Sequence, residues 1–159
     1  MKDITIQQVA IGDRESWTRT ITEADVVFYA GIIGDRGPMH LDEEFAKTTR
    51  FGGRVSYGML NAGYIGAVLA QLLGIRSAYV AQTLAFLAPV MIGDTVKIEA
   101  VVIRKDEQRS RAWVRTTCTP SKRNARDRRR GGAVLFLRRW ISRTPRSDGL
   151  GSRSSPVVF

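Results

Sequence analysis

The chain has a single cysteine, Cys118, and a single histidine, His40, in 159 residues. One cysteine excludes an internal disulfide, and one His with one Cys cannot complete the usual structural zinc site. No apolar run reaches the ~18 residues that a membrane span requires, and none follows the charged N-terminus. We therefore expect a soluble, cytoplasmic protein without a transmembrane segment.

Acidic residues are scarce toward the C-terminus. Residues 1–119 contain 14 Lys and Arg against 13 Asp and Glu, whereas residues 120–159 contain 11 against 2. The C-terminal segment therefore carries +9 of the net charge of +10. We expect one domain over residues 1–119 and a solvated, arginine-rich segment over residues 120–159. Because that segment has few aromatic rings and no known nucleic-acid motif, we expect no specific nucleic-acid partner and no membrane partner.

The only histidine lies in a segment that glycine and proline interrupt. His40 follows Asp35 by five residues, among Gly34, Gly37 and Pro38. Such a segment can neither continue a helix nor pair as a central strand, so we expect an irregular loop. Acid–base chemistry near neutral pH must use His40 or carboxylates alone, which makes Asp35 and His40 the candidates. Taken alone, Asp35 also fits a turn-forming residue that bonds its own backbone.

The hydrophobic pattern predicts an α+β fold. Period-two alternation and turn residues predict strands at 4–9, 16–21, 78–87, 95–104 and 111–119, and helical spacing predicts helices at 41–49 and 59–73. A further helix begins after Thr22, which can cap it together with Asp25, and Gly31 and Gly34 end it. A long apolar helix followed by an antiparallel meander predicts a sheet wrapped around one helix.

The helix at 59–73 is the strongest prediction. Apolar residues cover most of its circumference, and we therefore expect it to be buried. Its remaining side carries small or polar residues, namely Asn61, Gly63, Gly66 and Gln71.

Two interpretations of the chain beyond Pro120 stay open. Residues 132–137 form the one remaining apolar run and would supply a closing strand after a basic loop, with disorder beyond it. Alternatively, everything past Pro120 is a replaced or frame-shifted C-terminus. Without a closing strand, one sheet edge would be exposed and prone to aggregation.

Four ordered blocks carry a resemblance over about residues 5–119. They are Gly34 to Asp42, Phe51 to Arg54, Tyr57 to Leu60, and Phe86 to Val90 with Gly93 to Val96. Together they resemble the MaoC-like (R)-specific enoyl-CoA hydratase and dehydratase family. The resemblance implies a single hot-dog fold, a homodimer, and water addition to trans-2-enoyl-CoA giving (R)-3-hydroxyacyl-CoA, with no metal or redox cofactor. It also implies a lyase of fatty acid metabolism whose substrate is an acyl-CoA or acyl-carrier-protein thioester.

The resemblance assigns roles to named residues. Asp35 and His40 match the catalytic acid–base pair, and the backbone N–H of Gly58 matches the donor to the thioester oxygen. Tyr57 and Met59 flank that glycine as further substrate-binding candidates. A helix N-terminus has free N–H groups and a partial positive charge, which suit a developing enolate.

The chain departs from the family pattern in its loop. The family usually reads Gly-Asp-x-Asn-Pro-x-His, and Gly37 replaces the Asn, which removes a side chain that can brace the loop. Gly66 stands where some members have a serine near the active site, and Tyr57 stands where His is common. Two alternatives to hydration therefore remain: a hot-dog acyl-CoA thioesterase, and a non-catalytic thioester-binding subunit.

Overall fold

The computed structural model describes residues 3–121 and the strand at residues 133–142. The elements, in chain order, are η1 (Ile6–Gln8), β1 (Arg14–Thr20), α1 (Glu23–Ile33), α2 (Pro38–Leu41), α3 (Glu43–Thr48), α4 (Gly58–Leu73), β2 (Ser77–Ala85), β3 (Thr95–Asp106), β4 (Arg111–Pro120) and β5 (Ala133–Ser142). None of the helices in this described part has the length and apolarity needed to cross a membrane.

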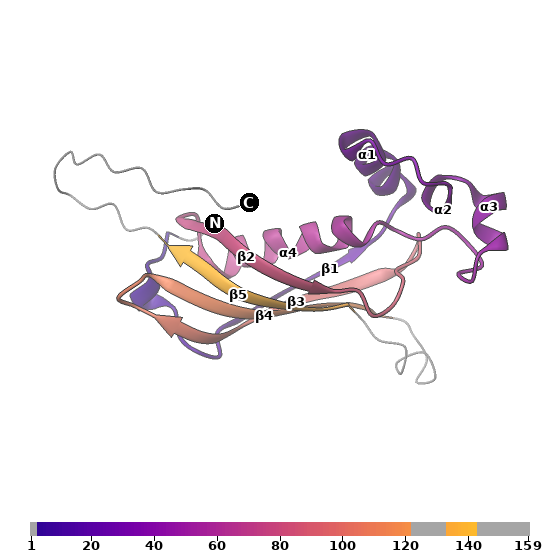
Figure 1. The fold of residues 1–159 in the computed structure, drawn as a ribbon. Coiled ribbons are helices and arrows are strands. Elements are labelled where there is room, and N and C mark those ends of the chain that lie inside the picture. The colour runs from indigo at the N-terminus through magenta and orange to yellow at the C-terminus, as the bar shows by residue number, and fades with distance from the viewer. Residues whose placement is uncertain (1–2, 122–132, 143–159) are drawn as a thin grey trace.

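One antiparallel sheet and one long helix form the body of the fold. The strand order is β1-β3-β4-β5-β2, and α4 lies along one face of the sheet (Figure 1). Alternate residues of β3 are buried against it, and the helix buries Ile65, Val68 and Leu69 completely. This period-two burial beneath an apolar helix confirms the predicted α+β hot-dog architecture, with a sheet around a central helix.

The three shorter helices lie together at one end of α4, beyond the sheet (Figure 1). α1 begins with the predicted capping box: the Thr22 hydroxyl accepts from the Asp25 N–H, and the Asp25 carboxylate accepts from the Thr22 N–H. Gly31 stays within the helix, and Gly34 ends it in the left-handed conformation at φ 75°. The chain then passes through α2 and α3 to the N-terminus of α4.

The expected strand at residues 4–9 is wrong. The chain instead forms the 3₁₀ turn η1, because the Gln8 side chain accepts a hydrogen bond from the Thr5 N–H at 2.8 Å. Ile6 and Val9, spaced three apart, are both buried by this turn. The apolar residues at 4–9 therefore do not form a strand; Ile6 and Val9 instead fix a turn to the core.

The expected helix at 41–49 is also different. It divides at Asp42 into α2 and α3, because Asp42 ends the first and its side chain caps the second by accepting from the Phe45 N–H at 3.0 Å. Pro38 occupies the first position of α2, where its missing N–H costs nothing. His40 therefore lies on a one-turn helix and not in an irregular loop.

β5 lies between β4 and β2, so that Leu135 pairs with Thr116 on one side and Leu84 on the other. This strand covers most of the apolar run at 132–137 and extends to Ser142. The predicted basic loop before it and the predicted disorder after it lie outside the described residues.

Candidate active site

A cavity of about 480 Å³ opens where α2, the N-terminus of α4 and the segment after β2 meet. It contains all five residues that the sequence singled out, which are Asp35, His40, Tyr57, Gly58 and Met59. Most of the remaining lining is apolar, and Phe86, Leu87 and Met39 contribute to it. The cavity therefore combines a few polar groups with apolar walls, as small-molecule sites commonly do.

The His40 ring is held by its Nδ1 atom. This nitrogen lies 2.7 Å from the carbonyl oxygen of Val55. Because a carbonyl only accepts hydrogen bonds, Nδ1 carries the proton and the lone pair of the neutral ring is at Nε2. The imidazole is thus oriented with Nε2 available to take or return a proton.

Asp35 both forms a turn and reaches the cavity. Its Oδ1 accepts a hydrogen bond from the Gly37 N–H at 2.9 Å, which is the turn geometry considered from the sequence. No other hydrogen bond to this carboxylate occurs within the described residues, so its second oxygen is open to a ligand. A Cβ placed on Gly37 would lie 3.2 Å from Oδ1 and 3.4 Å from His40 Cδ2. The carboxylate and the imidazole therefore both lie close to the one point that a side chain of Gly37 would occupy.

Tyr57 is buried between these two residues and α1. Its ring stacks on His40 with centroids 3.9 Å apart and planes 27° apart, and it packs against Tyr29 at 5.3 Å. Its hydroxyl donates to the backbone carbonyl of Asp35 at 2.6 Å. Burial, and then the nearby Asp35 charge, raise the pKa of Tyr57, so the phenol stays protonated as a donor.

The N-terminus of α4 faces the same cavity. No side chain caps this end, so the first backbone N–H groups of the helix are free, beginning with Gly58. The Phe86 ring lies against Gly58 so closely that an added Cβ would be 2.9 Å from its Cε1 atom. Met59 lines the cavity with its side chain about half exposed, at 54%.

A buried polar pair lies deeper in the cavity wall. Ser56 and Asn61 are 6% and 4% exposed, and the Ser56 hydroxyl donates to Asn61 Oδ1 at 3.2 Å. The sequence placed Asn61 on the side of the helix that carries small and polar residues, and the structure shows that this position is buried.

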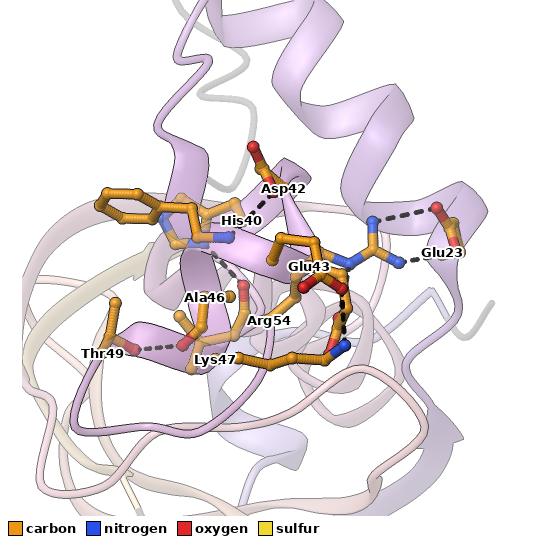
Figure 2. A network of polar contacts seen from close by, with 11 residues as sticks. Glu23, His40, Asp42, Glu43, Ala46, Lys47, Thr49 and Arg54 are labelled. Atoms are coloured by element: carbon orange, nitrogen blue, oxygen red, sulfur yellow. Dashed lines mark hydrogen bonds and ion pairs between the residues drawn. The ribbon is translucent and has the colours of Figure 1, made fainter.

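Sequence reasoning also missed an ionic network behind the site. Arg54 makes a two-pronged contact with Glu23 at 2.8 and 3.0 Å and reaches Glu43 at 3.2 Å (Figure 2). Hydrogen bonds to Arg54 lower the pKa of Glu23. These contacts connect α1 and α3 to the segment that contains Val55. The sequence did not predict them because Arg54 and Glu23 lie far apart along the chain.

Within the described residues, no group of three or more His, Cys, Asp or Glu side chains lies close enough together to hold a metal ion.

Known proteins are similar to this chain in sequence. The model of the family described as MaoC like domain matches residues 8–123. The chain is 40% identical over 120 residues to 3-hydroxybutyryl-CoA dehydratase of Methylorubrum extorquens, covering 75% of this chain and 76% of that protein. It is 41% identical over 114 residues to (R)-specific enoyl-CoA hydratase of Rhodospirillum rubrum, covering 71% and 79%.

A solved structure has the same overall fold. R-Hydratase PhaJ1 from Pseudomonas aeruginosa, in its unliganded form, superposes with a TM-score of 0.78 at 27% identity, covering 98% of this chain and 96% of that one. With a family match over most of its length and relatives at about 40% identity, this chain belongs to the MaoC-like domain family.

Proposed function

We propose that the protein is a hydro-lyase that interconverts trans-2-enoyl-CoA and (R)-3-hydroxyacyl-CoA by adding and removing water. The observation that carries the proposal is that Asp35 and His40 both approach the Cβ position of Gly37, in one cavity with the N-terminus of α4. The relatives in M. extorquens and R. rubrum are named as a dehydratase and a hydratase of CoA thioesters, which supports the same chemistry.

The acid–base step uses a water molecule between Asp35 and His40. Because Nδ1 of His40 donates to Val55, Nε2 accepts a proton from the water while the free Asp35 oxygen orients it. The hydroxide adds to the β-carbon of the enoyl group, and the π electrons move through the α-carbon to the thioester oxygen. Return of the proton to the α-carbon completes the addition of one water, and the reverse sequence is dehydration.

The enolate oxygen requires hydrogen-bond donors, which α4 supplies. The Gly58 N–H is the first free donor of a 16-residue helix, whose N-terminus carries a partial positive charge. A donor of this kind acts more strongly on the enolate than on the neutral thioester, so it lowers the barrier of the reaction. Gly58 is therefore the proposed oxyanion donor.

The walls of the cavity suit an acyl chain. Met59, Phe86 and Leu87 are about half exposed beside the proposed acid–base pair, and they give the acyl group apolar contacts. The thioester carrier, CoA or an acyl-carrier protein, would extend from the mouth of the cavity. Met59 is thus a proposed substrate-binding residue.

We also propose a homodimer. β2 is an edge strand, and two of its apolar side chains, Tyr79 and Val80, are 43% and 41% exposed. On α1, which also contributes to the lining of the cavity, Phe28 and Ile32 are 75% and 76% exposed, and Asp35 is exposed as well. A second copy that covers these surfaces would bury apolar area and close the site.

Sedimentation tests the dimer. Val80→Lys should shift the protein toward monomer and lower its activity, whereas Ile103→Lys, at a similarly exposed apolar residue of β3, should do neither. A wild-type protein that is monomeric and fully active would contradict the dimer.

The hydratase proposal is tested with crotonyl-CoA and a thiol reagent in parallel. Hydration should remove the absorbance of the conjugated thioester without releasing free thiol. Release of free CoA would identify a thioesterase instead. Binding without either change would identify a non-catalytic thioester-binding subunit, and both of these outcomes would overturn the proposal.

A further inference from the structure

We propose that Tyr57 is a positioning residue that holds the acid, the base and the oxyanion donor in one arrangement. This inference rests on the proposed function, since it concerns the same site. Tyr57 contacts Asp35 and His40 directly, and its own backbone begins α4, whose first N–H belongs to Gly58. In the described residues, no other side chain contacts both members of the proposed pair in this way.

The hydrogen bond from Tyr57 restrains the backbone at Asp35. Asp35 is exposed and has Gly34 and Gly37 on its two sides, and these glycines allow more backbone freedom than other residues would. The Tyr57 hydroxyl holds the Asp35 carbonyl from outside the segment at 2.6 Å. The direction in which the Asp35 carboxylate leaves the backbone is thereby fixed.

The ring of Tyr57 restrains His40 in a second way. The bond from Nδ1 to Val55 holds one edge of the imidazole but does not contact its face. Stacking against the Tyr57 ring at 3.9 Å fixes the plane. The two contacts together set the direction of Nε2.

The space around Gly37 explains why this support comes from another element. A Cβ at Gly37 would lie 3.2 Å from Asp35 Oδ1, which is tighter than ordinary van der Waals contact. A side chain at this position would press on the proposed acid. Position 37 therefore adds no support to the bond that Asp35 itself makes within the segment, and Tyr57 supplies further support from the start of α4.

A purely structural role for Tyr57 gives different expectations. A core aromatic residue contributes through burial of its ring, and Tyr57 is 4% exposed. Tyr57→Phe keeps the ring and its stacking but removes the hydroxyl, so a structural role predicts a small change in stability and none in turnover. The positioning role predicts a loss of kcat at nearly constant KM.

Three variants test the inference in the full-length protein with crotonyl-CoA. Tyr57→Phe should lower kcat roughly tenfold, the rate equivalent of one hydrogen bond of about 1.4 kcal/mol, with KM unchanged within about twofold. Tyr57→Leu should lower it further, because stacking is also lost. Tyr64→Phe is the matched control, since Tyr64 is also on α4 but packs against Trp17 and Arg19 outside the cavity, and it should retain wild-type kcat.

NMR provides a readout that does not depend on turnover. Because His40 is the only histidine, its imidazole protons are assigned without ambiguity. The stacked ring should shift them upfield in the wild type and in Tyr57→Phe, and the shift should disappear in Tyr57→Leu. The Gly37 amide should exchange faster with solvent in Tyr57→Phe than in Tyr64→Phe.

The two readouts separate the possible failures. A wild-type protein that does not hydrate crotonyl-CoA, but shows the NMR changes, would refute the proposed function and leave Tyr57 ordering the segment. An active wild type with unchanged kcat in Tyr57→Phe would refute the positioning role. Unchanged His40 resonances in a folded Tyr57→Leu would refute it as well.

Discussion

Two glycines of α4 are predicted to respond in opposite ways to the same substitution. Gly63 lies in the middle of the 16-residue helix and is exposed, and a Cβ there would meet no atom within 4 Å. Gly58 begins the helix, and a Cβ there would lie 2.9 and 3.0 Å from two atoms of the Phe86 ring. Alanine is thus accommodated freely at one position and forces movement at the other.

The magnitudes follow from these surroundings. Gly63→Ala removes backbone freedom from the unfolded chain and should raise the free energy of unfolding by about 0.5–1 kcal/mol. Gly58→Ala should lower it by about 1 kcal/mol, at the low end of overpacking costs, because Phe86 is 51% exposed and can turn outward. It should also lower activity, since the displaced ring belongs to the cavity wall.

Urea denaturation followed by circular dichroism measures both effects. The midpoints should move in opposite directions with unchanged slope. Stabilisation by Gly58→Ala would refute the packing against Phe86. A loss of stability in Gly63→Ala that depends on protein concentration would place Gly63 in a subunit interface and refute the expectation of open space around it.

Three other predictions concern the body of the fold. Burial raises the pKa of the Cys118 thiol to about 11, so a thiol reagent at pH 8 should label it only as fast as the protein unfolds, and rapid labelling of the folded protein would contradict this. Truncation after Pro120 removes β5 and leaves β2 unpaired, so this fragment should aggregate while truncation after Ser142 does not; a soluble, cooperatively folding short fragment would refute the role of β5. Burial opposes ionisation of Asp25, but hydrogen bonds from Thr22 and Arg19 outweigh this effect and lower the pKa of the carboxyl below 3.8. The ionised carboxylate therefore contributes to the free energy of unfolding above pH 3.8, and this contribution is lost as the pH falls through the pKa of the folded state. Asp25→Asn should therefore reduce the thermal midpoint at pH 7 and have little effect in strong acid, and an equal reduction at both would contradict the assignment.

The sequence predicted the elements whose signals are local. The capping box at Thr22, the apolar pattern of α4 and the alternation in β3 and β4 each depend on neighbouring residues, and each is present in the structure. The prediction of a strand at residues 4–9 was wrong because a pair of buried residues this close together occurs both in strands and in turns. The correct answer depended on the Gln8 side chain closing that turn.

The candidate site was predicted as a set of residues but not as an arrangement. Asp35 and His40 were singled out from the loop sequence, Gly58 came from the resemblance to the family, and all three line the cavity. The contacts that orient them are long-range: Tyr57 to the Asp35 carbonyl, and Arg54 to Glu23. Neither contact follows from a periodic pattern or a motif, because each joins residues that lie far apart in the sequence.

Substitution of the proposed acid–base pair tests the central claim most directly. Asp35→Asn and His40→Gln keep the size and much of the hydrogen bonding of the side chains but remove their proton-transfer ability. Each should lower the rate of crotonyl-CoA hydration by about 10²–10⁴-fold while circular dichroism and the denaturation midpoint stay close to wild type. Wild-type hydration rates in either folded variant would contradict the proposed chemistry.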